Sequence, residues 1–125
     1  MLSNSAPDHQ PGVKLWVHDS GYSLSYYCPG CKRPHSINHQ PGHGPTWTWT
    51  GGVEKPTFHP SVACSGTEPS DDPEKFDDPN FDVPYVCHVF VREGMIEFLG
   101  DCTHSLKGQT VAMPDWPGKA AYDNL

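Results

Sequence analysis

A four-residue turn with two thiols, Cys28-Pro29-Gly30-Cys31, constrains this chain more than any other feature. A C-x-x-C turn directs both sulfurs to one point, and a structural zinc ion takes four such soft or borderline ligands in a tetrahedron. The chain has only 125 residues, of which 35% are hydrophobic. Domains with so small a core are often stabilised by a metal ion or by disulfides. The turn therefore predicts a domain folded around a structural Zn²⁺.

The rest of the chain favours short strands. It contains 14 Pro and 12 Gly residues, and both types interrupt helices. The clearest element is a β-hairpin, in which residues 85–92 and 95–99 flank the turn Glu93-Gly94. We therefore predict an all-β, zinc-ribbon or knuckle-like domain with about six short strands and little helix. It would span residues 13–117, with polar tails at 1–12 and 118–125.

The hairpin suggests where the other zinc ligands come from. Cys87 and His88 lie on its first strand, whereas Cys102 and His104 follow its second, so both pairs are expected at the same end of the hairpin. Consecutive residues of a strand point to opposite faces, so Cys87 and His88 should not bind the same ion. Two ligand sets remain open: Cys28, Cys31, Cys87 and Cys102, or Cys28, Cys31 and His88 with either Cys102 or His104.

Simpler interpretations accompany these features. The C-x-x-C pair suits a redox site or buried thiols as well, although no helix follows it as in thioredoxin-like proteins. Cys64 has no partner by spacing and is expected in the core. Trp47 and Trp49 share one face of a predicted strand, which fits core packing or a binding surface.

Negative charge is concentrated in one segment. The formal net charge is −7, and residues 68–82 alone contribute −6. This argues against direct nucleic-acid binding, which needs a basic surface. Residues 66–83 are predicted to form a mobile acidic loop, which serves either as a solvated linker or as a contact for a basic protein. No apolar stretch is long enough to cross a membrane.

An ordered set of short motifs resembles a known family. The motifs span residues 22–117, from Tyr27-Cys28-Pro29-Gly30-Cys31 through Pro56-Thr57-Phe58 and Cys87-His88 to Asp101-Cys102-Thr103-His104. They are similar to small phage and prophage proteins of unassigned function, often labelled ammonia monooxygenase. The resemblance implies a phage context and supplies no mechanism. Because residues 1–12 contain no apolar segment of the kind found in a secretory signal, the expected location is the cytoplasm of the bacterial host. It favours His88 over Cys87, so the expected metal ligands are Cys28, Cys31, His88 and Cys102.

Two functions follow from these patterns. The preferred one is a non-enzymatic accessory protein of a phage or prophage, in which a zinc-stabilised module binds a host or phage protein and inhibits, for example, a host defence system. No catalytic residue is assigned in that case. The alternative is a small zinc- or Ser-dependent hydrolase of peptidase or amidase type. In its serine version, Ser61 on a Pro-rigidified turn lies near His88 or His104 and Asp101.

Overall fold

A computed structural model describes residues 9–70 and 72–118. These residues form strands and loops, with one short 3₁₀ helix, η1 (Pro79–Phe81). The nine strands found there are β1 (Leu15–Val17), β2 (Ser23–Cys28), β3 (Arg33–Asn38), β4 (Thr48–Thr50), β5 (Thr57–His59), β6 (Val62–Glu68), β7 (Val83–Arg92), β8 (Met95–Phe98) and β9 (Thr110–Ala112).

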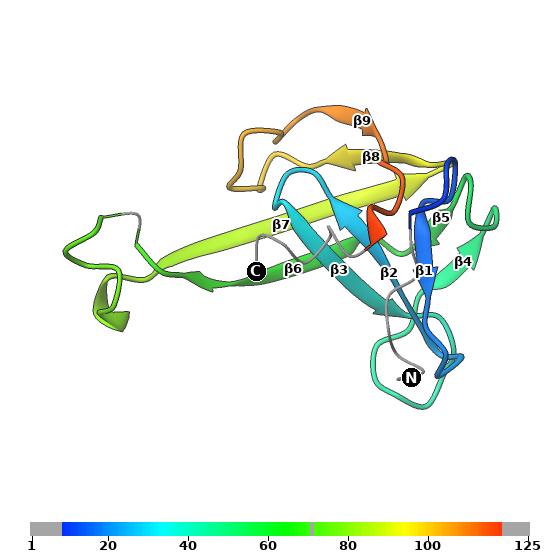
Figure 1. The fold of residues 1–125 in the computed structure, drawn as a ribbon, viewed down its shortest axis with the longest axis horizontal. Coiled ribbons are helices and arrows are strands. Elements are labelled where there is room, and N and C mark those ends of the chain that lie inside the picture. The colour runs from blue at the N-terminus through cyan, green and yellow to red at the C-terminus, as the bar shows by residue number, and fades with distance from the viewer. Residues whose placement is uncertain (1–8, 71, 119–125) are drawn as a thin grey trace.

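The strands form three antiparallel sheets, with the orders β1-β2-β3, β4-β5 and β6-β7-β8-β9. Figure 1 shows that β6 and β7 extend well beyond the other strands as a two-stranded arm, with η1 near its far end. The all-β prediction is confirmed. The predicted hairpin is also confirmed: Arg92 pairs with Met95 across Glu93 and Gly94, and both turn residues have positive φ angles, as a tight hairpin turn requires.

The sequence underestimates the number and length of the strands. β5 lies between Pro56 and Pro60 and pairs with β4 in a two-stranded sheet, where proline at the ends of a strand is tolerated. β6 continues to Glu68 and β7 begins at Val83, so both enter the segment predicted as a loop. Pairing across the arm satisfies the backbone there, which the polar sequence did not indicate.

The core lies between the three-stranded and the four-stranded sheet. Along β7, Cys87, Val89 and Val91 are buried, whereas His88 and Phe90 on the other face are partly exposed. The buried side chains also include Leu24, Tyr26 and Ile37 from the first sheet and Ile96 and Phe98 from β8. This alternation gives β7 one face toward the core and one toward solvent.

The predicted tails at 1–12 and 118–125 lie largely outside the described residues.

Trp47 and Trp49 are partly buried and pack against the core, in line with the core-packing interpretation. Within the described ranges, no helix is long and apolar enough to cross a membrane.

Candidate active site and candidate metal centre

Strand β7 places two groups of reactive side chains on opposite faces of the large sheet. Cys87 is 1% exposed and faces the C-x-x-C turn. His88, the next residue, pairs with Ala63 of β6 and directs its side chain to the other face. The thiol group and the histidine therefore belong to different sites.

The first site is a cluster of four potential metal ligands. Cys28 ends β2, Cys31 closes the turn, Cys87 lies on β7 and His104 follows β8, and their ligand atoms all lie within 4.8 Å of one another. The sulfurs of Cys28 and Cys87 are 3.8 Å apart. In a tetrahedral site with Zn–S distances of about 2.3 Å, two sulfur ligands lie about 3.8 Å from each other. The spacing thus fits a four-coordinate ion.

The chemistry of the cluster also fits a cation. Nε2 of His104 is buried and has no hydrogen-bond partner among the described residues. Hydrogen bonds from Cys31 and Cys87 lower the pKa of Cys28, whereas hydrogen bonding with Cys28 and Cys31, together with burial, raises the pKa of Cys87. A metal ion would remove this competition for protons, because it binds such buried sulfurs as thiolates. Three Cys and one His form a known structural zinc set.

His35 on β3 supports the cluster from inside the core. Its ring is 7% exposed. Burial lowers the pKa of His35, but the neighbouring thiols of Cys28, Cys31 and Cys64 raise it more, to about 12. A charged imidazole at this position would stabilise thiolates beside it. Sequence analysis missed this role, because the pairing of His35 with Tyr26 across β2 and β3 becomes visible only once the sheet is known.

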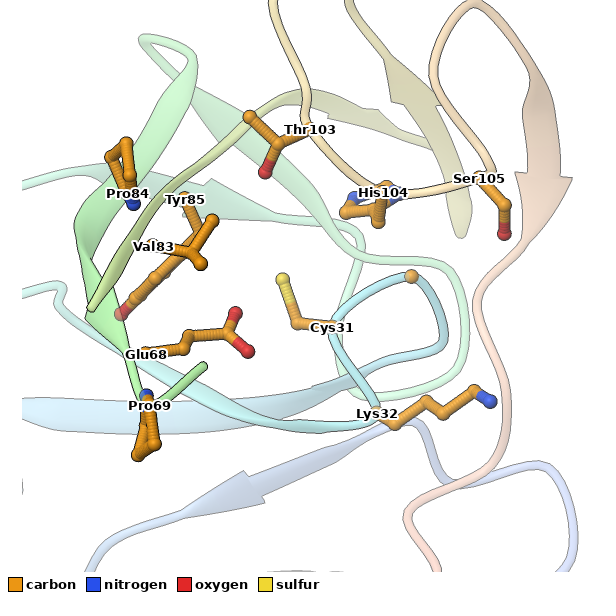
Figure 2. Close-up of a pocket in the computed structure, with 11 residues that line it drawn as sticks. Cys31, Lys32, Glu68, Pro69, Val83, Pro84, Tyr85, Thr103, His104 and Ser105 are labelled. Carbon is orange, nitrogen blue, oxygen red and sulfur yellow. The ribbon is translucent and has the colours of Figure 1, made fainter. Parts of the chain in front are cut away.

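A hollow of about 600 Å³ opens beside this cluster. The hollow lies between the loop that carries His104 and the part of the arm where β6 ends and β7 begins. Figure 2 shows Cys31 in its wall, with the sulfur directed into the hollow. Cys31 and His104 are partly exposed there, so this side of the cluster is in contact with solvent. The hollow contains none of the residues of the second site.

The second site is a chain of hydrogen bonds on the opposite face of the sheet. The hydroxyl Oγ of Ser61 lies 2.9 Å from Nε2 of His88, and Nδ1 of His88 lies 3.1 Å from Oδ2 of Asp101. When Asp101 accepts the proton of Nδ1, Nε2 is left as the acceptor for the Ser61 hydroxyl. This is the geometry of a nucleophile, its base and an orienting carboxylate.

The backbone around this chain is also held in place. Trp47 Nε1 donates to the carbonyl oxygen of Ser61 at 3.0 Å. The sulfur of Cys102 lies 3.3 Å from both the backbone nitrogen and the carbonyl oxygen of His88. Trp47 and Cys102 therefore fix the positions of the serine and the histidine without touching their reactive atoms.

The structure divides the sequence-predicted residues between the two sites. Cys28 and Cys31 lie together, as expected, but the group they join contains Cys87 and His104. Of the other two expected ligands, His88 contacts Ser61 and Asp101, and Cys102 contacts the backbone of His88. Which four residues bind a metal stays a prediction. Of the residues that the serine-hydrolase alternative named, Ser61, His88 and Asp101 lie together, whereas His104 lies in the thiol cluster.

Comparison with known proteins gives a match to a protein family. The model of a family described as "Bacterial ubiquitination-like system serine protease (BubE)" matches residues 2–99. No curated protein and no solved structure matches the chain. The matched region includes Ser61 and His88, and Asp101 follows two residues after its end. The description names a bacterial system, so it does not support the phage context implied by the resemblance.

Proposed function

Because this chain belongs to the family of bacterial ubiquitination-like system serine proteases (BubE), we propose that it is a serine peptidase with Ser61 as its nucleophile. The observation that carries this proposal is the continuous hydrogen-bonded chain from Ser61 through His88 to Asp101. The family description names the reaction class, and the geometry provides residues for it. The substrate is then a peptide bond in a protein of such a bacterial system.

In the proposed hydrolysis, Ser61, His88 and Asp101 each have a separate role. Oγ of Ser61 attacks the carbonyl carbon of the scissile bond while Nε2 of His88 takes the hydroxyl proton. His88 then passes this proton to the leaving amine, and an acyl-enzyme remains on Ser61. A water molecule attacks the acyl-enzyme, again with His88 as base, which releases the acid and restores the serine. Asp101 keeps Nδ1 protonated and stabilises the imidazolium that forms at both stages.

For the metal centre we propose one structural Zn²⁺ held by Cys28, Cys31, Cys87 and His104. Four protein ligands fill a tetrahedral site, which leaves no position for substrate. The ion would tie the C-x-x-C turn to β7 one residue before His88. Its contribution would therefore be to folding and to the position of His88. This differs from the zinc-hydrolase version of the alternative function, in which the metal activates water.

The proposal is tested with a fluorophosphonate probe, which reacts with activated serines, followed by peptide mass spectrometry. We expect the full-length protein to be labelled at Ser61 and to cleave at least some members of an internally quenched peptide library. Ser61→Ala should abolish labelling and cleavage, whereas Ser20→Ala, a matched change at an exposed serine elsewhere on the surface, should leave both unchanged. Wild-type protein that is neither labelled nor active, or that is labelled at another serine, would contradict the proposal.

A further inference from the structure

The strand that begins beside the nucleophile has an unpaired edge. β6 starts at Val62, one residue after Ser61, and is an outer strand of the four-stranded sheet. Its inner edge pairs with β7, and within residues 9–70 and 72–118 no strand pairs with its outer edge. On an edge strand, alternate residues direct their N–H and C=O groups outward, where another extended chain can bind them.

Small side chains leave this edge accessible. Cross-strand pairing places Ala63 beside His88, Ser65 beside Val86 and Thr67 beside Pro84, so these residues share the face that carries the serine–histidine pair. All three β6 side chains are exposed, and so is Gly66. Edge strands are usually protected by charged residues, proline or a bulge. Val62 to Thr67 contains no charged residue and no proline.

The far end of the arm has a different chemistry. Between β6 and β7, Glu74, Asp77 and other acidic side chains are exposed, and Lys75 is the single basic residue of this segment. The loop and the start of β7 also expose Phe76 (56%), Phe81 (46%) and Val83 (52%). Acidic and apolar groups thus meet at the end of the arm that lies farthest from β5 (Figure 1).

The active site itself lies on an open face. Ser61 is partly exposed and the side chain of Asp101 is 58% exposed, and the hollow of about 600 Å³ lies on the metal side. An open face beside an unpaired strand suits a substrate that gains its affinity from a long extended segment rather than from a deep pocket.

On the premise that the chain is a serine peptidase, we propose that β6 binds its substrate as an added antiparallel strand, and that the acidic loop binds basic residues farther upstream in that substrate. β6 runs away from Ser61, so an antiparallel segment runs toward it and presents its carboxyl-terminal end to the nucleophile. The seven residues of β6 span about 23 Å at roughly 3.3 Å each. The substrate class is therefore a protein with about seven extended residues before the scissile bond, preceded by a basic segment.

Strand pairing is tested on the substrate, which leaves the protein unchanged. Single N-methyl groups are placed at each amide of the best peptide from the quenched library, from one to seven residues before the cleavage point. We expect kcat/KM to fall about tenfold or more at every second position, because only alternate amides donate to an edge strand. N-methyl groups after the cleavage point serve as controls and should not show this alternation. A scan without alternation would overturn the pairing.

The charge contribution is tested with peptides that carry five lysines or five glutamates eight to twelve residues before the cleavage point. The lysine peptide should be cleaved about tenfold faster in kcat/KM at low salt, and the difference should shrink as ionic strength rises. Glu74→Lys with Asp77→Lys should remove the preference, whereas Asp19→Lys with Glu54→Lys, two exposed acidic residues elsewhere, should keep it. Equal rates for both peptides, or a preference that survives the loop substitutions, would overturn the role of the loop.

A binding measurement separates this inference from the proposed function. The lysine peptide is added to full-length Ser61→Ala protein, and amide signals are followed by NMR. Residues of β6 should shift and gain protection from hydrogen exchange, and those of β9, the other outer strand of the same sheet, should not. Binding to β6 without any cleavage by the wild-type protein would retain the binding edge and contradict the peptidase. Cleavage without changes at β6 would contradict the binding edge alone.

Discussion

Cys87 and His88 are consecutive residues of β7 that point to opposite faces: Cys87 is buried against the C-x-x-C turn, and His88 bonds Ser61 on the other face. Sequence alternation predicted that they would not share an ion. In the structure they belong to two sites that one strand holds back to back. A metal that fixes Cys87 would therefore also fix the backbone next to His88, the proposed catalytic base.

This arrangement predicts that two histidine substitutions have separable effects. His104→Ala removes a proposed ligand and should lower the zinc content from about one per chain to well below that, as measured by elemental analysis. The melting temperature should fall by roughly 10 °C, which corresponds to about 3 kcal/mol for a domain of this size. His88→Ala should keep the zinc and most of the stability while it abolishes peptide cleavage.

The reverse pattern would favour the ligand set expected from the sequence. If His88→Ala and Cys102→Ala lose the metal while His104→Ala and Cys87→Ala retain it, then Cys28, Cys31, His88 and Cys102 form the site. Chelation of the wild-type protein provides a further check. Metal-free protein with an unchanged melting profile would contradict a structural role for any of these sets.

A second prediction concerns the close approach of the C-x-x-C turn to His104. A Cβ added at Gly30 would collide with the imidazole ring of His104. Gly30→Ala should therefore displace the ring, weaken metal binding and cost about 1–3 kcal/mol of unfolding free energy. Gly100→Ala is the matched control, because a Cβ there meets nothing within 4 Å, and its effect should stay within about 0.5 kcal/mol. Denaturant titrations of both variants measure the difference. Equal stability would show that the turn does not depend on this contact.

A third prediction concerns Asp101. Its carboxylate lies 3.1 Å from Nδ1 of His88, and Asp101→Asn would replace one acceptor oxygen by a donor or leave the wrong tautomer of His88. We expect kcat to fall about 10²-fold or more with little change in KM. Asp19→Asn, a matched change at an exposed aspartate away from both sites, should leave kcat unchanged. Full activity of Asp101→Asn would remove Asp101 from the proposed mechanism.

The sequence predicted the elements that depend on local pattern. The turn at Cys28–Cys31, the hairpin around Glu93-Gly94 and the all-β class follow from residue spacing and from turn chemistry. The alternation of side chains along β7 also predicts that Cys87 and His88 belong to different sites. These features rely on neighbours a few residues apart, which a sequence displays directly.

The assignment of residues to sites was less accessible, because it depends on how sheets pack. His88 and His104 were both candidates for either the metal or a serine. Only the structure shows that His104 lies against Gly30 and that His88 lies against Ser61. The loop after β8 places Asp101 and His104 on opposite sides of the sheet although they are three residues apart, and no periodic pattern in a loop predicts this.

A fourth prediction separates two tryptophans with the same kind of hydrogen bond. Trp47 Nε1 donates to the carbonyl of Ser61 at 3.0 Å, and Trp49 Nε1 donates to the carbonyl of Gly52 at 2.9 Å. Phe at either position removes one such bond, worth about 1 kcal/mol, so the two variants should lose similar stability in denaturant titrations. Trp47→Phe should also lower kcat about fivefold at unchanged KM, because the backbone of the nucleophile loses its anchor, whereas Trp49→Phe should retain wild-type kcat. Equal kcat values for the two variants would show that Trp47 contributes packing alone and does not position Ser61.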